Sequence, residues 1–445
     1  YIDLVYWVEG EYIYEAVKEF SYFMRDWRQN KAIQYDPRNL DLLAASQLLM
    51  DSSEPFELLS GYRTKKTNRM LSNVYDGVAQ NSYHMKAMAA DPLKIWTIGV
   101  AKVTKTWEEM GKQAGVPLIY SAKSGSADQA IQKFFVGDGQ KLYDAITDNG
   151  GGQEDAMSDN KAIVPLDVSK IKNWKNLIPA YKEGNVAANT IRNKKGEIVG
   201  VPYISNADSM AYNKSKVGGD IDTWDALFDS QFKGYAAMQN DSGPTLTTTA
   251  VYLKESGKQD IVNPSDMSKS EVKGVCQFLI DQKKKGQFRT FWDGFGNGVD
   301  LLASEEVLVS SCWEPIAVIA AKKGADIHYG TMKEGHQTWN NVWMLTKGGK
   351  QRGQEDNFYK LMDLYLSPWF GARTLANLGF TPQMTGVNEY VEANPSDFDA
   401  NKKAVIAQRL KNKADRMAVK GNSWQNLYPK ELRAYQDWWA KVQAA

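Results

Sequence analysis

Hydrophobic and polar positions follow a repeating order over most of the chain. After Pro92, short apolar runs alternate with segments of helical spacing, the runs at 93–98, 116–120 and 142–146 and the helical segments at 104–112 and 127–135. Strands that alternate with helices in this way are typical of right-handed βαβ units around a parallel sheet. The pattern therefore predicts an α/β fold for the large part of the chain.

Two longer apolar stretches, 199–213 and 327–345, enclose a second segment of α/β pattern. Such stretches are expected where the chain leaves one compact lobe and returns to it. They predict two lobes joined by crossover strands, with lobe 1 at about 92–205 plus 345–445 and lobe 2 at about 206–330. We expect the last helices, with Trp438 and Trp439 as core residues, to pack on lobe 1.

Residues 1–91 show a different pattern. A strand-like start at Leu4–Trp7 precedes helical spacing from Tyr14 to Phe23, and a second helical segment follows Asp36-Pro37. This pattern predicts a small α+β segment ahead of the larger unit.

Composition narrows the classes of function. The 54 Lys and Arg residues nearly balance the 53 Asp and Glu residues, and there is no run of five or six like charges, so we expect no nucleic-acid partner. No apolar stretch approaches the roughly 20 residues that cross a bilayer, which argues against an integral membrane protein. The sequence begins at Tyr1 without a basic and apolar leader, and we interpret it as an exported chain from which the signal peptide has been removed.

Catalytic motifs are scarce. No Gly-x-Gly-x-x-Gly or Walker-type loop occurs at a strand–helix junction, and Gly150-Gly151-Gly152 lacks the lysine of a phosphate loop. The chain has 3 histidines and no Gly-x-Ser-x-Gly motif, so the sequence gives little support for a Ser-His-Asp catalytic triad. The sequence therefore predicts a protein that is not an enzyme.

The N-terminal segment carries one metal-binding pattern. Ser60-Gly61-Tyr62-Arg63 is followed by Ser82-Tyr83-His84 and by Asp91. With the stretch from Tyr22 to Asp41, this segment resembles zinc-dependent murein endopeptidases of the D-Ala-D-Ala carboxypeptidase-like superfamily. The resemblance implies that His84 and Asp91 are zinc ligands and that Arg63 positions the peptide substrate.

That pattern is incomplete over residues 1–91. Ala87 stands where the family has a glycine, and the segment ends before a third histidine ligand and an acidic general base. A catalytic zinc ion normally has three protein ligands and a water molecule. We therefore expect a truncated, inactive peptidase-like segment, with zinc at His84 and Asp91 as the one cofactor suggested. A genuine fusion and a misjoined chain both remain open at Asp91-Pro92.

From residue 92 to the end, several motifs occur in a characteristic order. They are Pro202-Tyr203-Ile204, Met210–Asn213, Thr223–Phe228, Leu301–Val307 with Trp313, Lys333–Gly335 with Trp339, and Gly379–Pro382. This part resembles extracellular solute-binding proteins of ABC transporters, of the spermidine/putrescine-binding type. The resemblance implies a two-lobed periplasmic-binding-protein type 2 fold, a periplasmic monomer, a small solute in the inter-lobe cleft, and permease subunits as partners.

The same resemblance implies a set of solute contacts. Trp313 and Trp339 match tryptophans that pack against the ligand, and Asp241 matches an acid that pairs with an amine; aromatic faces and carboxylates are suited to holding ammonium groups. The complete predicted set is Asp148, Tyr203, Asp241, Trp292, Trp313, Glu314, Trp339, Asn341 and Gln383.

Departures from the polyamine pattern bear on the solute. Asn341 and Pro244 stand where polyamine binders have acids, and Ile98 and Val100 replace aromatic residues. A polyamine needs a negative group at each end, so a zwitterion or a monoamine with an acidic group fits better. The stretch Asp241–Thr245 either caps a helix or presents N–H groups to an anion.

The sequence thus predicts the extracytoplasmic solute-binding component of an ABC importer. Its solute would be a small nitrogen-containing compound, either polyamine-like, amino-acid-like or zwitterionic. The alternative is a zinc-dependent murein endopeptidase that acts through the N-terminal segment.

Overall fold

The computed structural model describes residues 7–8, 11–12, 21, 93–97, 107–122, 134–137, 139–181 and 186–445. The chain forms two compact units, Tyr1–Pro92 and Leu93–Ala445. In the first unit the described strands are β1 (Trp7–Val8) and β2 (Glu11–Tyr12), which pair antiparallel. The helices predicted there lie outside the described residues.

The larger unit has two lobes, and the sheet of lobe 1 has the strand order β4-β3-β5-β11-β6. Its strands are β3 (Leu93–Thr97), β4 (Leu118–Ala122), β5 (Ala145–Asn149), β6 (Val201–Asn213), β11 (Gln337–Leu345) and the short β12 (Thr381–Pro382) on the far side of β6. β3, β4 and β5 are parallel, whereas β11 is antiparallel to both β5 and β6. β5 and β6 therefore run in the same direction.

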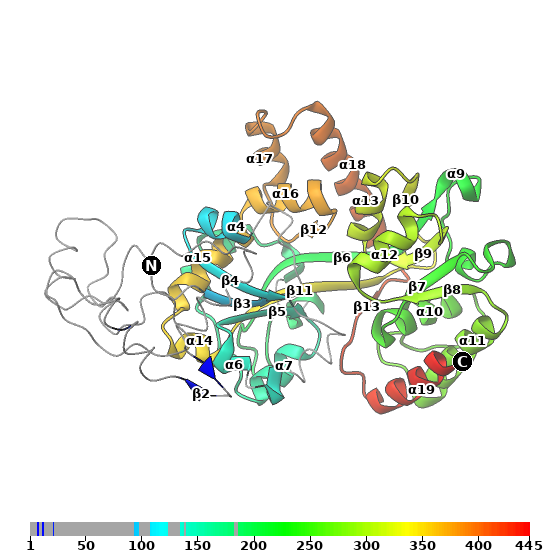
Figure 1. Cartoon of the computed structure of the whole chain (residues 1–445), viewed down its shortest axis with the longest axis horizontal. Coiled ribbons are helices and arrows are strands. Elements are labelled where there is room, and N and C mark those ends of the chain that lie inside the picture. Colours follow the sequence, from blue (N-terminus) through cyan, green and yellow to red (C-terminus); the bar gives the residue numbers. More distant parts are fainter. Residues whose placement is uncertain are drawn as a thin grey trace, which may run out of the picture. The chain divides into compact units, whose positions relative to one another are not determined.

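The sheet of lobe 2 uses the second half of β6 and has the order β6-β9-β7-β8. Its other strands are β7 (Ala236–Gln239), β8 (Phe288–Trp292), β9 (Val309–Cys312) and β10 (Ile327–Tyr329), which pairs with β6. β9 is antiparallel to β6, and β7 and β8 run parallel to β9. The carboxyl ends of the parallel strands of both lobes therefore face each other where β6 and β11 cross from lobe to lobe (Figure 1).

Helices flank both sheets. Those of lobe 1 are α4 (Trp107–Ala114), α6 (Gly139–Leu142), α7 (Gln153–Asp159), α8 (Val186–Asn189), α14 (Lys347–Gln351), α15 (Glu355–Tyr365), α16 (Pro368–Leu378), α17 (Val387–Ala393) and α18 (Ala400–Met417), with short 3-10 turns at Val168–Lys170, Lys172–Asn176 and Pro179–Tyr181. Those of lobe 2 are α9 (Lys214–Val217), α10 (Ser242–Glu255), α11 (Lys269–Lys284), α12 (Gly294–Ala303) and α13 (Glu314–Lys322), with 3-10 turns at Trp224–Leu227 and Ser230–Phe232.

Helical spacing explains how α15 covers lobe 1. Phe358, Leu361, Met362 and Tyr365 recur at intervals of three and four residues and are all buried. The Tyr365 ring packs edge-on against Tyr203 of β6, with ring centroids 4.9 Å apart. The core of lobe 1 therefore reaches the crossover strands themselves.

The C-terminal helix departs from the prediction. After α18 the chain pairs with β11 as the short strand β13 (Ser423–Trp424), and α19 (Leu432–Ala444) then packs against α11 in lobe 2. Tyr435, Trp439 and Val442 form one apolar face of α19 and are buried in the lobe 2 core. The expectation that all the last helices lie on lobe 1 is wrong for α19, because its apolar face packs against α11 and α10 and against Phe291 of β8, all in lobe 2.

A buried charge cluster joins the lobes beside the crossover strands. Glu314, the first residue of α13, accepts a hydrogen bond from Lys413 Nζ at 2.7 Å and another from Arg416, both on α18. Asp208 of β6 accepts from Trp339 Nε1 at 2.7 Å, and Lys413 also donates to Asn206 at 3.3 Å. Because the earlier turns of α18 pack on lobe 1, this cluster connects lobe 1 to α13 of lobe 2.

Burial dominates the electrostatics of this cluster. Desolvation raises the pKa of Asp208 to about 7, although hydrogen bonds from Trp339 and Asn206 and the nearby cations oppose the shift. Burial likewise lowers the pKa of Lys413 to about 8, against the attraction of Glu314. The charges are therefore stabilised only by one another and by their hydrogen bonds.

We predict that the free energy of unfolding falls between pH 5 and pH 8. The folded protein keeps the Asp208 proton up to about pH 7, whereas the unfolded chain loses it near the usual value of 3.8, so stability declines as pH rises through that interval. Asp208→Asn should remove roughly 1–3 kcal/mol of this decline, because asparagine does not titrate and still accepts from Trp339. Urea unfolding at the two pH values tests this, and an equal decline in both proteins would contradict it.

Candidate functional site

The crossover strands present a polar face at the junction of the lobes. Across β11 and β6, Gln337 lies opposite Asp208 and Trp339 opposite Asn206, and across β11 and β5, Asn341 lies opposite Asn149. Directly opposed residues share one face of a sheet. Four amides and a carboxyl therefore line the face of the sheet that also carries Trp339.

Asn341 is the predicted contact whose geometry most favours a ligand. Its side chain is 0% exposed, and neither its amide oxygen nor its amide nitrogen has a hydrogen-bond partner among the residues that the structure describes. The buried amide of Gln337, four residues earlier on the same face, is also unpartnered. A buried amide without partners costs free energy, and a bound solute is one way to satisfy it. The register of β6 and β11 shifts beside Asn341, a local irregularity often found next to binding sites.

The three predicted tryptophans differ in their surroundings. Trp292 is 1% exposed and donates to the carbonyl oxygen of Ser311, while Trp339 is 5% exposed and donates to Asp208. Trp313 retains partial exposure and packs against the apolar cores of both lobes. Its indole meets Trp292 edge-on, with centroids 5.2 Å apart. Trp313 is therefore the tryptophan best placed to meet a solute at the lobe junction.

The predicted carboxylates have partners within the protein. Asp241 caps α10 by accepting from Gly243 N at 3.0 Å, so the structure shows the helix-cap alternative for Asp241–Thr245. Glu314 is held by Lys413 and Arg416 as described above, and Asp148 is buried and accepts from Asn149 N at 2.8 Å. These contacts explain each acid without a ligand.

Tyr203 and Gln383 also have internal roles. The Tyr203 hydroxyl accepts from Thr147 Oγ1 at 3.0 Å within the lobe 1 core. The Gln383 side chain donates to Ser205 at 2.8 Å and accepts from the Tyr181 hydroxyl at 2.7 Å. Their assignment as solute contacts stays a prediction, and the geometry places both in the supporting framework.

The predicted zinc ligands His84 and Asp91 lie outside the described residues. Within the described part of the chain, no three His, Cys, Asp or Glu side chains cluster in a way that could hold a metal ion. His336 is buried and accepts from Met332 N at 2.9 Å, and burial lowers its pKa to about 4. Zinc at His84 and Asp91 remains a prediction.

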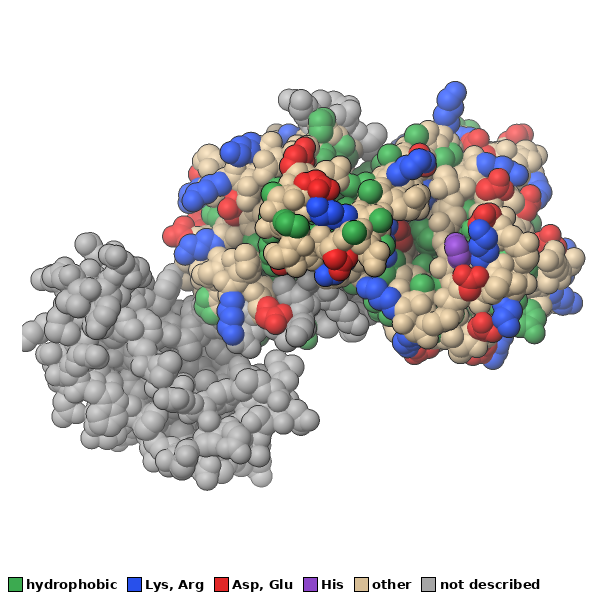
Figure 2. Space-filling model, turned by 90° about the horizontal axis from the view of Figure 1, so that it is seen from above, with side chains coloured by type: hydrophobic (Ala, Val, Ile, Leu, Met, Phe, Trp, Pro, Cys, Tyr) green, Lys and Arg blue, Asp and Glu red, His purple; other side chains and the backbone are tan. Residues whose placement is uncertain are grey.

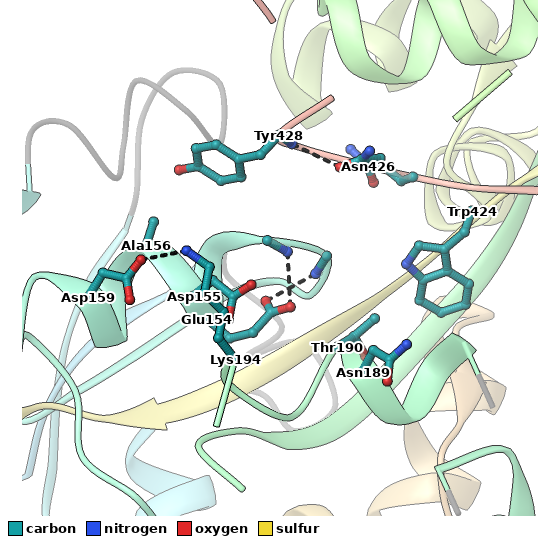
Figure 3. Close-up of a pocket in the computed structure, with 13 residues that line it drawn as sticks. Glu154, Asp155, Ala156, Asp159, Asn189, Thr190, Lys194, Trp424, Asn426 and Tyr428 are labelled. Atoms are coloured by element: carbon teal, nitrogen blue, oxygen red, sulfur yellow. Dashed lines mark hydrogen bonds and ion pairs between the residues drawn. The ribbon is translucent and has the colours of Figure 1, made fainter. Parts of the chain in front are cut away.

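A cavity of about 660 Å³ lies between the loop after β5 and the segment 424–428 (Figure 3). Gly151 and Gly152 form one wall with φ values of +128° and +117°, and a Cβ atom on Gly152 would stand 2.6 Å from the Tyr428 ring. Both the backbone conformation and the close approach therefore require glycine. The sequence signal for this cavity was the run of three glycines after a strand. That run was considered only as a phosphate loop, so the cavity was not predicted.

Glu154 lies on the same wall of the cavity. Its carboxylate accepts from Gly151 N at 3.1 Å and Gly152 N at 2.9 Å, and burial still raises its pKa to about 7. Among the carboxyls of the described cavity lining, Glu154 has the pKa that differs most from its usual value.

Lysine, arginine, aspartate and glutamate side chains are interspersed over the face seen in Figure 2, in keeping with the net charge of +1. Among the described helices, none has the length and apolar character needed to cross a membrane.

Residues 1–127 match the family model described as peptidoglycan L,D-endopeptidase MepK. The Escherichia coli K12 protein of that name is 41% identical over 80 residues, which cover 18% of this chain and 44% of the relative. The chain thus spans less than half the length of this relative. The prediction that the chain is not an enzyme is wrong as a statement about its whole length, because its N-terminal part is similar to an enzyme.

Solved structures resemble the larger unit. The spermidine/putrescine substrate-binding protein PotD from Streptococcus pneumoniae has a TM-score of 0.60 at 15% identity, covering 79% of this chain and 98% of that one. The Atu4243-GABA receptor has a TM-score of 0.55 at 17% identity, covering 79% of this chain and 98% of that one. The predicted two-lobed, type 2 α/β fold is confirmed.

A second family model, described as bacterial extracellular solute-binding protein, matches residues 137–404, which are more than half of the chain. This match covers both lobes and the crossover strands, including Trp313, Trp339 and Asn341. The chain belongs to the bacterial extracellular solute-binding protein family.

Proposed function

We propose that the larger unit captures a small nitrogen-containing solute at the lobe junction and delivers it to the permease of an ABC importer. The observation that carries this proposal is the fully buried, unpartnered amide of Asn341, which lies on the crossover strand where the carboxyl ends of both sets of parallel strands meet. In open α/β sheets, ligands bind outside the carboxyl ends of the strands. Trp313, in contact with the cores of both lobes, supplies an aromatic surface beside this junction.

A zwitterion fits the charges better than a polyamine does. Asp241, Glu314 and Asp148 all have partners inside the protein, so their negative charge is already partly compensated. The amides of Asn341 and Gln337 can each donate and accept, which suits a solute that carries an amine and an acidic group. The structural relatives named for polyamines and for GABA support nitrogen-containing solutes as a class.

The proposed working state is a monomer outside the cytoplasm, in the periplasm. β6, β11 and the segment that runs from β13 to α19 connect the lobes, and together they are the natural hinge. A solute that binds the closed form preferentially would shift the equilibrium toward that form, and the permease would bind it.

We predict that one member of a panel of amines, amino acids and small zwitterions raises the melting temperature of the full chain. A solute at 100 times its dissociation constant adds about 2.7 kcal/mol of stability. Asn341→Ala should weaken its binding by about tenfold, because one or more buried hydrogen bonds are lost. Titration calorimetry measures the affinity, and Asn401→Ala, at an exposed position of α18, is the matched control.

Two results would contradict this proposal. One is that no compound in a broad panel shifts the melting temperature. The other is that a ligand is found whose affinity is the same in the Asn341→Ala variant and in the unmodified chain.

A second function is favoured by the 41% identity of the N-terminal part to an L,D-endopeptidase. We propose that this part binds zinc through His84 and Asp91 and cleaves peptide cross-links of peptidoglycan, with Arg63 positioning the substrate. The match covers only 44% of that relative. The proposal therefore still requires a third zinc ligand and a general base.

We predict that the purified chain contains zinc and releases soluble fragments from peptidoglycan, and that His84→Ala abolishes both. Elemental analysis and chromatography of the released fragments measure the two effects. His328→Ala is the matched control, because His328 is exposed and pairs with Asp326. Zinc-free protein that releases nothing would eliminate this second function and leave the solute-binding proposal untouched.

A further inference from the structure

We infer that the cavity beside Gly151 and Gly152 is a second small-molecule site, which takes a hydroxylated compound with an ammonium group, such as an amino sugar. Its volume of about 660 Å³ lies within the roughly 300–1,000 Å³ of typical ligand pockets. The contacts of the lining residues define its location, its charge and its hydrogen-bonding needs.

The cavity lies on the side of β11 to which Asn340 points, opposite to the side of Asn341. Neighbouring side chains of a strand point to opposite faces of its sheet, so Asn340 and Asn341 of β11 face opposite ways. Asn340 Nδ2 donates to Thr190 Oγ1 at 2.7 Å, and Thr190 lines the cavity. The lining residues come from 151–159, 189–194 and 424–428, so no helix of lobe 2 contributes to it.

The charge of the lining favours a cation. Among the described lining residues, Glu154, Asp155 and Asp159 supply three carboxyls and Lys194 is the one basic residue. Lys194 pairs with Asp159 at 2.7 Å, and both side chains are more than half exposed, at 65% and 57%. That ion pair therefore belongs to the rim, where solvent screens it, and the other carboxyls of the described lining are those of Glu154 and Asp155.

Two buried polar atoms of the described lining residues have no hydrogen-bond partner within the part of the chain that the structure describes. One is the acceptor Oδ1 of Asp155, and the other is the donor Nε1 of Trp424. Figure 3 shows the indole of Trp424 and the ring of Tyr428 at opposite ends of the segment that closes the cavity. A ligand that satisfies both atoms needs a donor, best supplied by an ammonium group beside Asp155, and an acceptor oxygen for Trp424.

The aromatic rings complete the chemical description. The faces of Trp and Tyr rings attract ammonium groups and pack against C–H surfaces. An amino sugar combines an ammonium group, hydroxyl oxygens and a C–H face in one compact molecule. A simple polyamine lacks the acceptor oxygen, and a neutral sugar lacks the positive charge.

The test compares D-glucosamine with D-glucose and N-acetyl-D-glucosamine by titration calorimetry on the full chain. N-acetylation removes the positive charge and keeps the ring, so it is the matched ligand control. We expect glucosamine to bind at least about tenfold more tightly than the other two, because a charged hydrogen bond is worth about 1.5–3 kcal/mol.

Two substitutions locate the binding. Asp155→Asn removes the charge and keeps the size, and Trp424→Phe keeps an aromatic ring and removes the N–H donor. Each should weaken glucosamine binding by about fivefold to tenfold or more. Asp356→Asn on α15 and Trp369→Phe on α16 are matched controls outside the lining, and they should leave the affinity unchanged.

Several outcomes would overturn the inference. Equal affinities for the three sugars, or no binding of glucosamine at millimolar concentration, would show that the cavity does not select an ammonium group. Glucosamine binding that is lost in Asn341→Ala but unchanged in Asp155→Asn would assign it to the lobe junction. Far-ultraviolet circular dichroism and thermal unfolding confirm that each variant is folded before its affinity is compared.

Discussion

The two lobes depend on one continuous strand that belongs to both sheets. β6 has 13 residues, and hydrogen bonds to β11 and β12 hold its first part while those to β9 and β10 hold its last part. Once its direction is set, the pairing of β11, β5 and β9 sets the direction of all the parallel strands. The loops that follow these strands must therefore meet at the lobe junction, and this is why the polar side chains of β11 and the N-terminal ends of α10 and α13 lie there.

The buried charges beside β6 add a second constraint. Glu314 begins α13, where a negative charge is favoured by the helix dipole, but its partners Lys413 and Arg416 come from α18. Separating them would leave charges unpaired in a dry environment, at a cost of about 3–5 kcal/mol. These ion pairs therefore oppose any opening of the lobes that would move α13 away from the last turn of α18.

The fold could be predicted further than the site. The alternation of strands and helices and the two long apolar stretches identify the α/β lobes and the crossover strands. A strand that is buried on both faces has a nearly continuous run of apolar residues, which can be recognised in the sequence. Site residues depend on partners distant in sequence, and no local pattern reveals them. Glu314 is a predicted solute contact, and its partners in the structure, Lys413 and Arg416, lie 99 and 102 positions away in the sequence. α19 was misplaced for the same reason, since the residues that cover its apolar face lie far away in the sequence, in lobe 2.

The opposite faces of β11 give the two sites a physical link. Asn341 faces the lobe junction, and its neighbour Asn340 holds Thr190 and accepts, through its carbonyl oxygen, the N–H of Gly150 at the edge of the cavity. The segment 424–428, which closes that cavity, continues from β13, which itself pairs with β11. A ligand in the cavity contacts a connection between the lobes and the lobe 1 loop at the same time. It would therefore favour the lobe arrangement in which that connection lies against Gly151 and Gly152, and by reciprocity a solute at Asn341 that favours the same arrangement would strengthen its binding.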